Sequence, residues 1–482
     1  MRILVVVLAM LLAGCAVNPV TGGRDFVLMS ETEELALGRE HHQKIIKQYR
    51  IYDNPTLQQY VRSVGDRVAR VSHRQNLIYR FTLLDSAQVN AFALPGGYIY
   101  ITRGLLAYLN SEAELAAVLG HELGHVTARH SVRQHSFSTT TRLLGGLIAA
   151  ATGVQGAGQL TDFLSTGIVR GYGREHELEA DGLGVEYLVK AGYRASAMKQ
   201  VISVLKNQEV FDKQLAIEQG RKPRAYHGIF STHPDNDVRL QTVLNRMGAQ
   251  ALTADISDRQ DVAFLQKLSG LTFGDSSEDG VILGNNFYHV DLDFKMVFPK
   301  GWVVTNSPNS IAASSLKNEA LIQLVLQDLN KKLTPKQFLK ARFGIKQAIS
   351  EAPLLVAGRR GHTAVINGKT PYGQGKLRVA VLFDESRAFV FFAAIKQEKD
   401  FAYFDKQVIK SINSLSALNR IDRLVATELR IELLTVNQRN NSIRRMTKNS
   451  PINNHAEQQT RLLNDLFPKG EPKAGDLIKI VR

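Results

Sequence analysis

The sequence predicts a multi-domain α+β protein. With 482 residues, 44% of them hydrophobic, the chain is longer than a single hydrophobic core usually organises. Helical patterns dominate before residue 247, whereas strand-like runs interleaved with helical patterns follow it. A polar stretch at residues 275–280 marks the change. We therefore expect an α-rich first domain with a short sheet, followed by a small α+β domain and a small C-terminal module.

The first fifteen residues resemble a bacterial lipoprotein signal peptide. Met1 and Arg2 give a positive start, residues 3–12 are apolar but too short to span a bilayer, and small residues precede Cys15. Cleavage before Cys15 and lipidation of its thiol would anchor the protein to a membrane. Ala16 stands where an aspartate would favour the inner membrane, so we expect the periplasmic face of the outer membrane. The chain has no other cysteine, which excludes disulfides and cysteine metal ligands.

Residues 121–125 read HELGH, inside a helical pattern that a Ser-x-x-Glu capping box opens at Ser111. Residues four apart on a helix share a face, so His121 and His125 can bind one zinc ion. Glu122 then lies beside the metal, where it can act as the general base towards a water molecule. This arrangement is typical of enzymes that hydrolyse peptide bonds.

A catalytic zinc site usually has three protein ligands, so a third must come from elsewhere in the chain. Glu177 opens a second helical run at residues 176–191, and Asp181 lies one turn later on the same face. Asp181 would accept the free ring N–H of a zinc-bound histidine. Glu179 is an alternative ligand, but only Glu177 has a carboxylate four residues further on. No role is predicted for the histidines that lack partners at ligand spacing or lie off the ligand face: His41, His42, His130, His135, His176 and His227.

HExxH followed by ExxxD resembles the M48 family of zinc peptidases, which are gluzincins. The resemblance extends over residues 30–247. It implies a gluzincin-like peptidase domain with one Zn²⁺ per chain, bound by His121, His125 and Glu177. It also implies metalloendopeptidase activity with Glu122 as the catalytic base.

Residues 90–97 and the run at residues 98–102 resemble the family's turn and edge strand beside the active-site helix. An extended substrate can add to such an edge by main-chain hydrogen bonds. The resemblance therefore implies that Asn90, Tyr98 and Tyr100 lie along the bound substrate.

A later segment at residues 231–234 reads STHP, and Arg239 follows it. The segment resembles the family's His-Pro segment, whose histidine and arginine lie near the metal. The resemblance implies two alternatives for His233: a reversible fourth ligand that blocks the metal, or a donor to the transition state. Arg239 would hold either His233 or the oxyanion. The sequence does not decide between these roles.

Residues 143–161, between the two zinc motifs, form an uncharged stretch rich in glycine. Its glycines and glutamines disfavour a stable spanning helix, although its length approaches that of a membrane span. We expect a packed helical hairpin or a mobile lid near the cleft, with contact to hydrophobic substrates or lipid as the alternative.

The second half carries two weaker resemblances. Residues 298–302 read FPKGW, and with the strand order that follows they resemble small α+β domains of the PsbP and Mog1 type. Residues 473–481 resemble the closing strand of a LysM module, although the usual Gly-Asp-Thr turn is missing from its start. The predicted segments are 1–15, signal peptide; 16–260, M48-like zinc peptidase domain; 261–282, linker; 283–420, PsbP/Mog1-like α+β domain; and 425–482, LysM-like module.

The formal net charge of +15 suggests an anionic partner. We expect no nucleic-acid partner, because the chain has no recognised binding motif and carries an export signal. Attraction to anionic lipid or lipopolysaccharide fits an envelope protein, and a solvated basic surface is the alternative.

Together these features predict a zinc-dependent endopeptidase of the bacterial cell envelope that cleaves misfolded or stalled envelope proteins. Its partners would be polypeptide substrates, the membrane through lipidated Cys15, and either outer-membrane assembly machinery or peptidoglycan. Two other functions stay open. One is a chaperone or scaffold in outer-membrane protein assembly with latent proteolysis, and the other is a peptidoglycan-binding lipoprotein.

Overall fold

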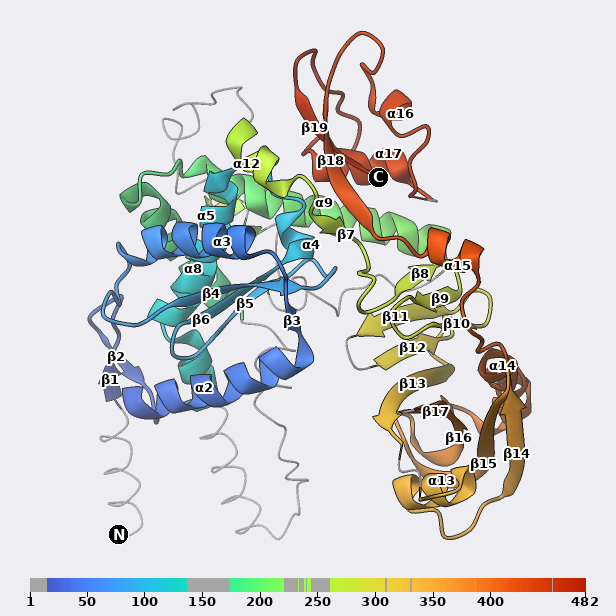
Figure 1. Cartoon of the computed structure of the whole chain (residues 1–482). Helices are drawn as coiled ribbons and strands as arrows, with labels where there is room; N and C mark the ends of the chain where they lie inside the picture. Colours follow the sequence, from blue (N-terminus) through green and yellow to red (C-terminus); the bar gives the residue numbers. More distant parts are fainter. Residues whose placement is uncertain are drawn as a thin grey trace, which may run out of the picture. The chain divides into compact units, whose positions relative to one another are not determined.

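The computed structural model describes residues 15–136, 173–220, 233, 238–239, 241–243, 261–307, 310–329, 332–385, 387–452 and 454–482. Residues 1–14 of the predicted signal peptide and the predicted lid at residues 143–161 lie outside this part. The chain divides into two compact units (Figure 1). The first takes its described residues from Met1–Ile217, Lys222–Phe273 and Arg430–Arg482, and the second from Glu218–Arg221 and Gly274–Leu429. None of the described helices combines the length and apolar character needed to cross a bilayer.

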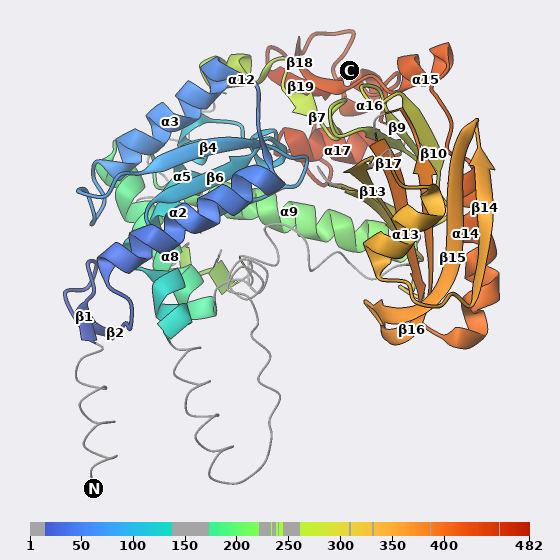
Figure 2. The same cartoon turned by 60° about the horizontal axis from the view of Figure 1, so that its bottom comes forward.

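A four-stranded sheet lies at the centre of the first unit, in the order β3-β4-β6-β5, with β4 and β6 parallel. Its strands are β3 (Arg50–Ile51), β4 (Arg80–Asp85), β5 (Ala91–Leu94) and β6 (Tyr98–Thr102). The helices of the unit include α2 (Glu31–Gln48), α3 (Pro55–Ala69), α4 (Arg103–Leu106), α5 (Glu112–Thr127), α8 (Arg174–Lys190), α9 (Ser196–Glu218) and α12 (Val262–Leu268). Helix α2 covers one face of the sheet, and α3 and α5 cover the other (Figures 1 and 2). A hairpin of β1 (Cys15–Val17) and β2 (Arg24–Phe26) precedes α2.

The sheet corrects the predicted edge strand. The chain reverses at Gly96 and Gly97, which both have positive φ, so β5 folds back along the outer side of β6. Strand β6 pairs with β4 on its other side and is therefore an inner strand, and the expectation that residues 98–102 form the edge was wrong. Within this sheet β5 occupies that edge. Tyr98 and Tyr100 belong to the core beneath α2, where the Tyr100 hydroxyl lies 2.6 Å from Nδ1 of His42.

The first unit also contains a three-stranded sheet that joins distant parts of the chain. Strands β19 (Leu477–Val481), β18 (Leu429–Thr435) and β7 (Thr272–Phe273) lie in that order, with α16 (Ile443–Met446) and α17 (Ala456–Leu463) between β18 and β19 in sequence. Lys479 on β19 is fully buried, and its ammonium group donates to the carbonyls of Ala107 and Leu109, both at 2.7 Å. Burial raises the pKa of Glu114 on α5 to about 7, while the Lys479 charge opposes this shift. The end of this sheet is thus joined to the chain that leads into α5.

The second unit is built on an antiparallel seven-stranded sheet with an apolar core on each face. The strand order is β11-β12-β13-β17-β16-β15-β14. The strands are β11 (Val303–Ser307), β12 (Ser310–Ser314), β13 (Ala320–Asp328), β14 (Ser350–Val356), β15 (Arg359–Thr370), β16 (Gly373–Phe383) and β17 (Arg387–Ile395). Helix α13 (Pro335–Phe343) packs on one face and α14 (Phe401–Asn413) on the other. Both faces are therefore buried, which explains the almost continuous apolar runs of β16 and β17.

A small three-stranded sheet in the order β10-β9-β8 and a short helix complete the second unit. These elements are β8 (Val281–Leu283), β9 (Asn286–His289), β10 (Phe294–Val297) and α15 (Arg420–Val425). Both units mix helices with sheets, as the predicted α+β class requires.

Candidate metal centre

Helices α5 and α8 carry most of the candidate site, and their close approach depends on glycine. The Ser111 hydroxyl caps α5 by accepting from the backbone N–H of Glu114 at 3.2 Å. A Cβ atom added to Gly124 would lie 3.0 Å from the carbonyl oxygen of Ala180, and one added to Gly184 would lie 3.1 Å from the backbone nitrogen of His121. The backbones of the two helices can therefore pack closely enough for residues of α8 to reach the histidines of α5.

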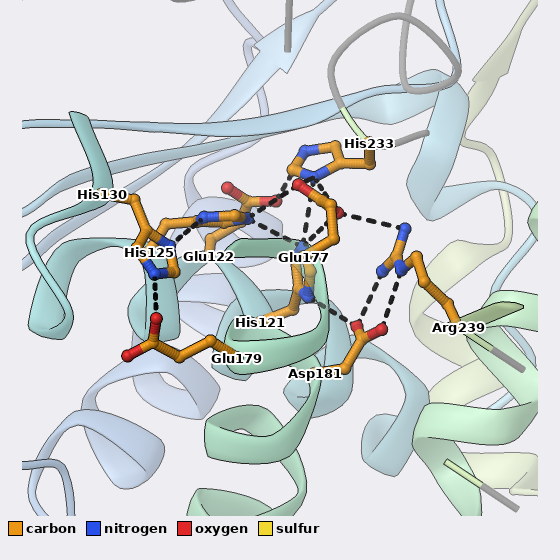
Figure 3. A network of polar contacts seen from close by, with 9 residues as sticks. All are labelled: His121, Glu122, His125, His130, Glu177, Glu179, Asp181, His233 and Arg239. Carbon is orange, nitrogen blue, oxygen red and sulfur yellow. Dashed lines mark hydrogen bonds and ion pairs between the residues drawn. The ribbon is translucent and has the colours of Figure 1, made fainter. Parts of the chain in front are cut away.

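Four buried side chains point donor atoms at a common centre: His121, His125, Glu177 and His233 (Figure 3). His121 Nε2 lies 3.0 Å from His125 Nε2 and 3.5 Å from Glu177 Oε2. The distance from His125 Nε2 to Glu177 Oε1 is also 3.5 Å. Zinc bonds of about 2.0–2.1 Å in a tetrahedron would place the donor atoms roughly 3.3 Å apart. The donor set and its spacing therefore fit a zinc ion, with Glu177, not Glu179, among the four donors.

His233 completes this group of donors. Its Nδ1 atom lies 3.1 Å from His121 Nε2 and 3.0 Å from Glu177 Oε2. Its Nε2 atom faces Glu122 Oε1 at 3.3 Å. The other carboxylate oxygen of Glu122 is buried and has no hydrogen-bond partner among the described residues. Burial raises the pKa of Glu122, as expected for a group that exchanges protons at the site.

Asp181 and Arg239 support His121. Asp181 Oδ1 lies 2.8 Å from His121 Nδ1, on the side of the ring opposite to the donor cluster. Arg239 donates to both carboxylate oxygens of Asp181, at 2.7 and 2.8 Å, and its Nη1 lies 3.3 Å from Glu177. All of these side chains are buried. Arg239 therefore contacts two carboxylates of α8.

A second network, which the sequence did not reveal, supports His125. His125 Nδ1 lies 2.8 Å from Nδ1 of His130, and His130 Nε2 lies 3.0 Å from Glu179. Arg133 donates to the same carboxylate oxygen at 3.0 Å. His130 reaches this place because Arg129 adopts a left-handed φ of 56°, which interrupts the helix and redirects the chain after α5.

The electrostatics of the metal-free site follow from burial and these contacts. Burial alone would raise the pKa of Glu177, but the charges of His233 and Arg239 lower it to about 2. Burial would lower the pKa of His121, but its contact with Asp181 raises it to about 9. Burial lowers the pKa of His125 well below its ordinary value. The pKa values of His121 and His125 are therefore shifted in opposite directions.

The other predicted site residues are not members of the donor cluster. Asn90 is buried next to β5, where its backbone N–H donates to the Thr102 hydroxyl at 3.1 Å. The rings of Tyr98 and Tyr100 both stack on the ring of His42 of α2. Cys15 begins β1, and its side chain is not among those described.

A sequence model of Peptidase family M48 matches residues 55–247, which include the whole donor cluster. The chain contains a peptidase domain of family M48. Members of this family use a metal, typically zinc, and the donor set of the M48 domain described above suits that ion.

The curated relatives of the chain include proteins whose names describe proteases. The chain is 30% identical over 185 residues to the putative beta-barrel assembly-enhancing protease of Vibrio cholerae, covering 36% of this chain and 38% of the relative. It is 29% identical over 228 residues to the beta-barrel assembly-enhancing protease of Escherichia coli K12, covering 45% and 44%. The mitochondrial metalloendopeptidase OMA1 of Schizosaccharomyces pombe is 27% identical over 246 residues, with 50% and 68% covered. The chain thus spans less than half the length of the two bacterial relatives.

The chain also resembles solved structures at low sequence identity. Cyanobacterial PsbP from Synechocystis is 14% identical, with a TM-score of 0.22, and the match covers 30% of this chain and 98% of that one.

Proposed function

We propose that the protein is a zinc-dependent endopeptidase of the bacterial cell envelope. The observation that carries the proposal is the group of four buried donors at tetrahedral spacing with the Glu122 carboxylate beside it. Zinc, when bound, polarises a carbonyl and lowers the pKa of a coordinated water towards about 7. A single site of this kind supports hydrolysis of a peptide bond.

Glu122 would move the proton in this reaction. Its buried position and raised pKa suit a group that takes a proton from the nucleophile and returns it to the leaving amine. It lies one residue after His121 on α5, yet it is not one of the clustered donor residues. We therefore assign it to proton transfer and not to metal binding.

The experiment that tests this proposal compares the wild type with Glu122→Gln. Both proteins should bind close to one zinc per chain, whereas cleavage of casein should fall by about 10²–10⁴-fold or more in the variant. A wild type that binds no zinc would contradict the proposed activity. So would a Glu122→Gln change that leaves casein cleavage unaltered both in the wild type and in the His233→Ala background.

We propose further that the protease is latent in the described conformation because His233 blocks the metal. Its Nδ1 atom stands among the donor atoms, at the vertex that a nucleophilic water would need. Removal of this imidazole should then expose activity. Peptidase assays of His233→Ala at matched zinc occupancy decide the sign: a rise supports blocking, whereas a loss of about 10²-fold supports transition-state stabilisation.

Substrates would be extended or unfolded polypeptides, in keeping with the proteolytic names of the relatives. Strand β5 offers its outer edge to such a chain, because only β6 pairs with it in the described sheet. This placement moves the proposed substrate contact from Tyr98 and Tyr100 to the main chain of β5.

The proposed location is the periplasmic face of the outer membrane, anchored through lipidated Cys15. The support is the lipoprotein-like signal and, for the two bacterial relatives, names that mention beta-barrel assembly. Cys15→Ser should leave an unprocessed precursor that no longer fractionates with the outer membrane.

The other functions have different tests. A chaperone or scaffold in outer-membrane assembly would keep its effect in the Glu122→Gln variant. A peptidoglycan-binding lipoprotein with a LysM-like module and a PsbP/Mog1-like domain would sediment with purified peptidoglycan. The strand-helix-helix-strand order of β18, α16, α17 and β19 is the feature that supports peptidoglycan binding as an alternative.

A further inference from the structure

We propose that His130 and Glu179 are positioning residues that fix the ring orientation and the tautomer of His125 for metal binding. This inference rests on the proposed function, because it concerns how one ligand of the zinc site is held. Its basis is the unbroken line of contacts from His125 through His130 to Glu179 (Figure 3). Arg133 donates to the same carboxylate oxygen of Glu179.

The contact between the two rings permits one arrangement of protons if His125 binds the metal. His125 directs Nε2 to the donor cluster, 3.0 Å from His121 Nε2, and directs Nδ1 away from it. A histidine that binds through Nε2 must carry its proton on Nδ1. That N–H then donates to Nδ1 of His130 across 2.8 Å.

The same reasoning fixes the next bond. Because Nδ1 of His130 accepts, its neutral ring carries the proton on Nε2. This N–H donates to Glu179 Oε2 at 3.0 Å, which also accepts from Arg133. Each donor in the line therefore faces an acceptor.

Packing holds the His130 ring between His125 and Glu179, where it can bond to both. The side chain is fully buried, and its ring stacks on that of His176 at a centroid distance of 4.3 Å and an interplanar angle of 22°. Arg129, immediately before it, is anchored by a 2.8 Å bond to the buried carboxylate of Glu34. His130 is therefore pre-organised before a metal arrives, which is what a positioning residue needs.

His130 is not a fifth ligand. It is absent from the group of residues whose donor atoms gather at the centre, and its nearest nitrogen faces the outer edge of His125. Its effect on the metal must therefore pass through His125. Partners of this kind typically change metal affinity by about 10–100-fold when they are removed.

The experiment measures zinc affinity of the full chain by competition with a chromophoric chelator, together with thermal unfolding of the metal-free protein. His130→Phe keeps a ring but removes the acceptor, so zinc should bind about 10–100-fold more weakly. His130→Asn places an amide oxygen near the position of Nδ1, and it should recover most of that loss. Rescue by this smaller side chain is not expected if His130 only fills space.

His176→Phe is the matched control, because phenylalanine keeps a ring that can stack on His130 and none of the residues in the line from His125 to Glu179 is changed. It should bind zinc as the wild type does. Zinc affinity of His130→Phe equal to that of the wild type would overturn the inference. A wild type that binds no zinc would instead remove the proposed function, so the two failures are distinguishable.

If His130→Phe does not fold, ¹⁵N NMR of the histidine rings in the zinc-loaded wild type provides the second test. We expect a protonated Nδ1 in His125 and an unprotonated Nδ1 in His130. The opposite assignment would overturn the inference, because His130 would then be the donor and His125 could not bind through Nε2 as a neutral ring.

Discussion

The two ligand histidines of α5 are held in different ways. His121 contacts the carboxylate of Asp181 directly, and Arg239 neutralises that carboxylate from the far side. His125 contacts another imidazole, and the carboxylate of Glu179 stands one residue further away. The first support is charged and buried, whereas the second places a neutral ring between the ligand and the charge.

The position of each histidine on α5 explains the difference. His121 lies where α5 packs against α8, so a carboxylate on the neighbouring helix reaches it. His125 is in the last turn before α5 ends at Thr127, and its partner comes from the chain after the break at Arg129. A direct carboxylate raises the proton affinity of its histidine, as the raised pKa of His121 shows, whereas a neutral partner does not. The donor cluster thus combines a histidine with a raised pKa and one with a lowered pKa.

Removal of the imidazole ring of His121 or of His125 is expected to have the largest effect on zinc affinity. His121→Ala and His125→Ala each delete a donor nitrogen, so zinc affinity should fall by more than the roughly 100-fold that marks the upper range for supporting residues. Chelator competition measures both variants under one set of conditions. If one variant kept wild-type zinc affinity, the histidine removed in it would not be a zinc ligand. The comparison of two differently supported ligands would then be wrong.

Removal of the charged support should cost both affinity and stability. Asp181→Ala leaves Arg239 buried without its main partner, so zinc affinity should fall about 10–100-fold and the unfolding free energy by about 3–5 kcal/mol. Denaturant unfolding of the metal-free protein gives the second value. Asp181→Asn, which retains an acceptor for both neighbours, is the control and should lose less of each. Unchanged stability in Asp181→Ala would show that Arg239 finds another partner.

Protonation of Glu179 in acid should weaken the contacts that support His125 and so lower the stability of the protein. Its pKa is about 2 in the folded protein and near 4.5 in an unfolded chain, so the unfolded state takes up the proton first as pH falls. The stabilisation is therefore complete above about pH 4.5 and declines towards pH 2. Thermal unfolding of the metal-free protein across this range should show a shallower decline in Glu179→Gln. Parallel curves for the two proteins would contradict the low pKa of Glu179.

The smallest effect on stability is expected at Arg133, which contacts Glu179 at the end of the line of contacts that begins at His125. Arg133 and Glu179 are each 25% exposed, so their ion pair is partly screened by water. Arg133→Met should lower the unfolding free energy by about 1 kcal/mol or less, with little change in zinc affinity. A loss as large as that of Asp181→Ala would show that the two supports are energetically alike.

The sequence predicted the members of the donor cluster better than the network that holds His125. His121, His125 and Glu177 follow from helical spacing, which depends only on local geometry. His130 was assigned no role because an uninterrupted helix would place it off the ligand face. The left-handed turn at Arg129 has no signature in the sequence, since nothing but tertiary structure keeps a non-glycine residue there.

The fold was predictable to a similar degree. Capping residues and apolar periodicity predicted α5, and the structure begins this helix at the expected cap. The position of residues 98–102 within the sheet could not be read from the sequence, because strand order depends on the parallel pairing of β4 with β6 across intervening chain. The predicted domain boundaries, the PsbP/Mog1 likeness and the LysM likeness stay predictions.

The buried ammonium group of Lys479 has a consequence for the order of assembly. Its bonds to the carbonyl of Ala107 and to that of Leu109 join residues up to 372 positions apart in sequence. A ribosome or an export channel delivers the earlier partner long before the later one. During that interval the segment leading into α5 lacks these hydrogen bonds, so the peptidase unit can finish folding only after residue 479 has emerged. A protein with a proteolytic centre would thereby reach its complete form late in its own synthesis and delivery.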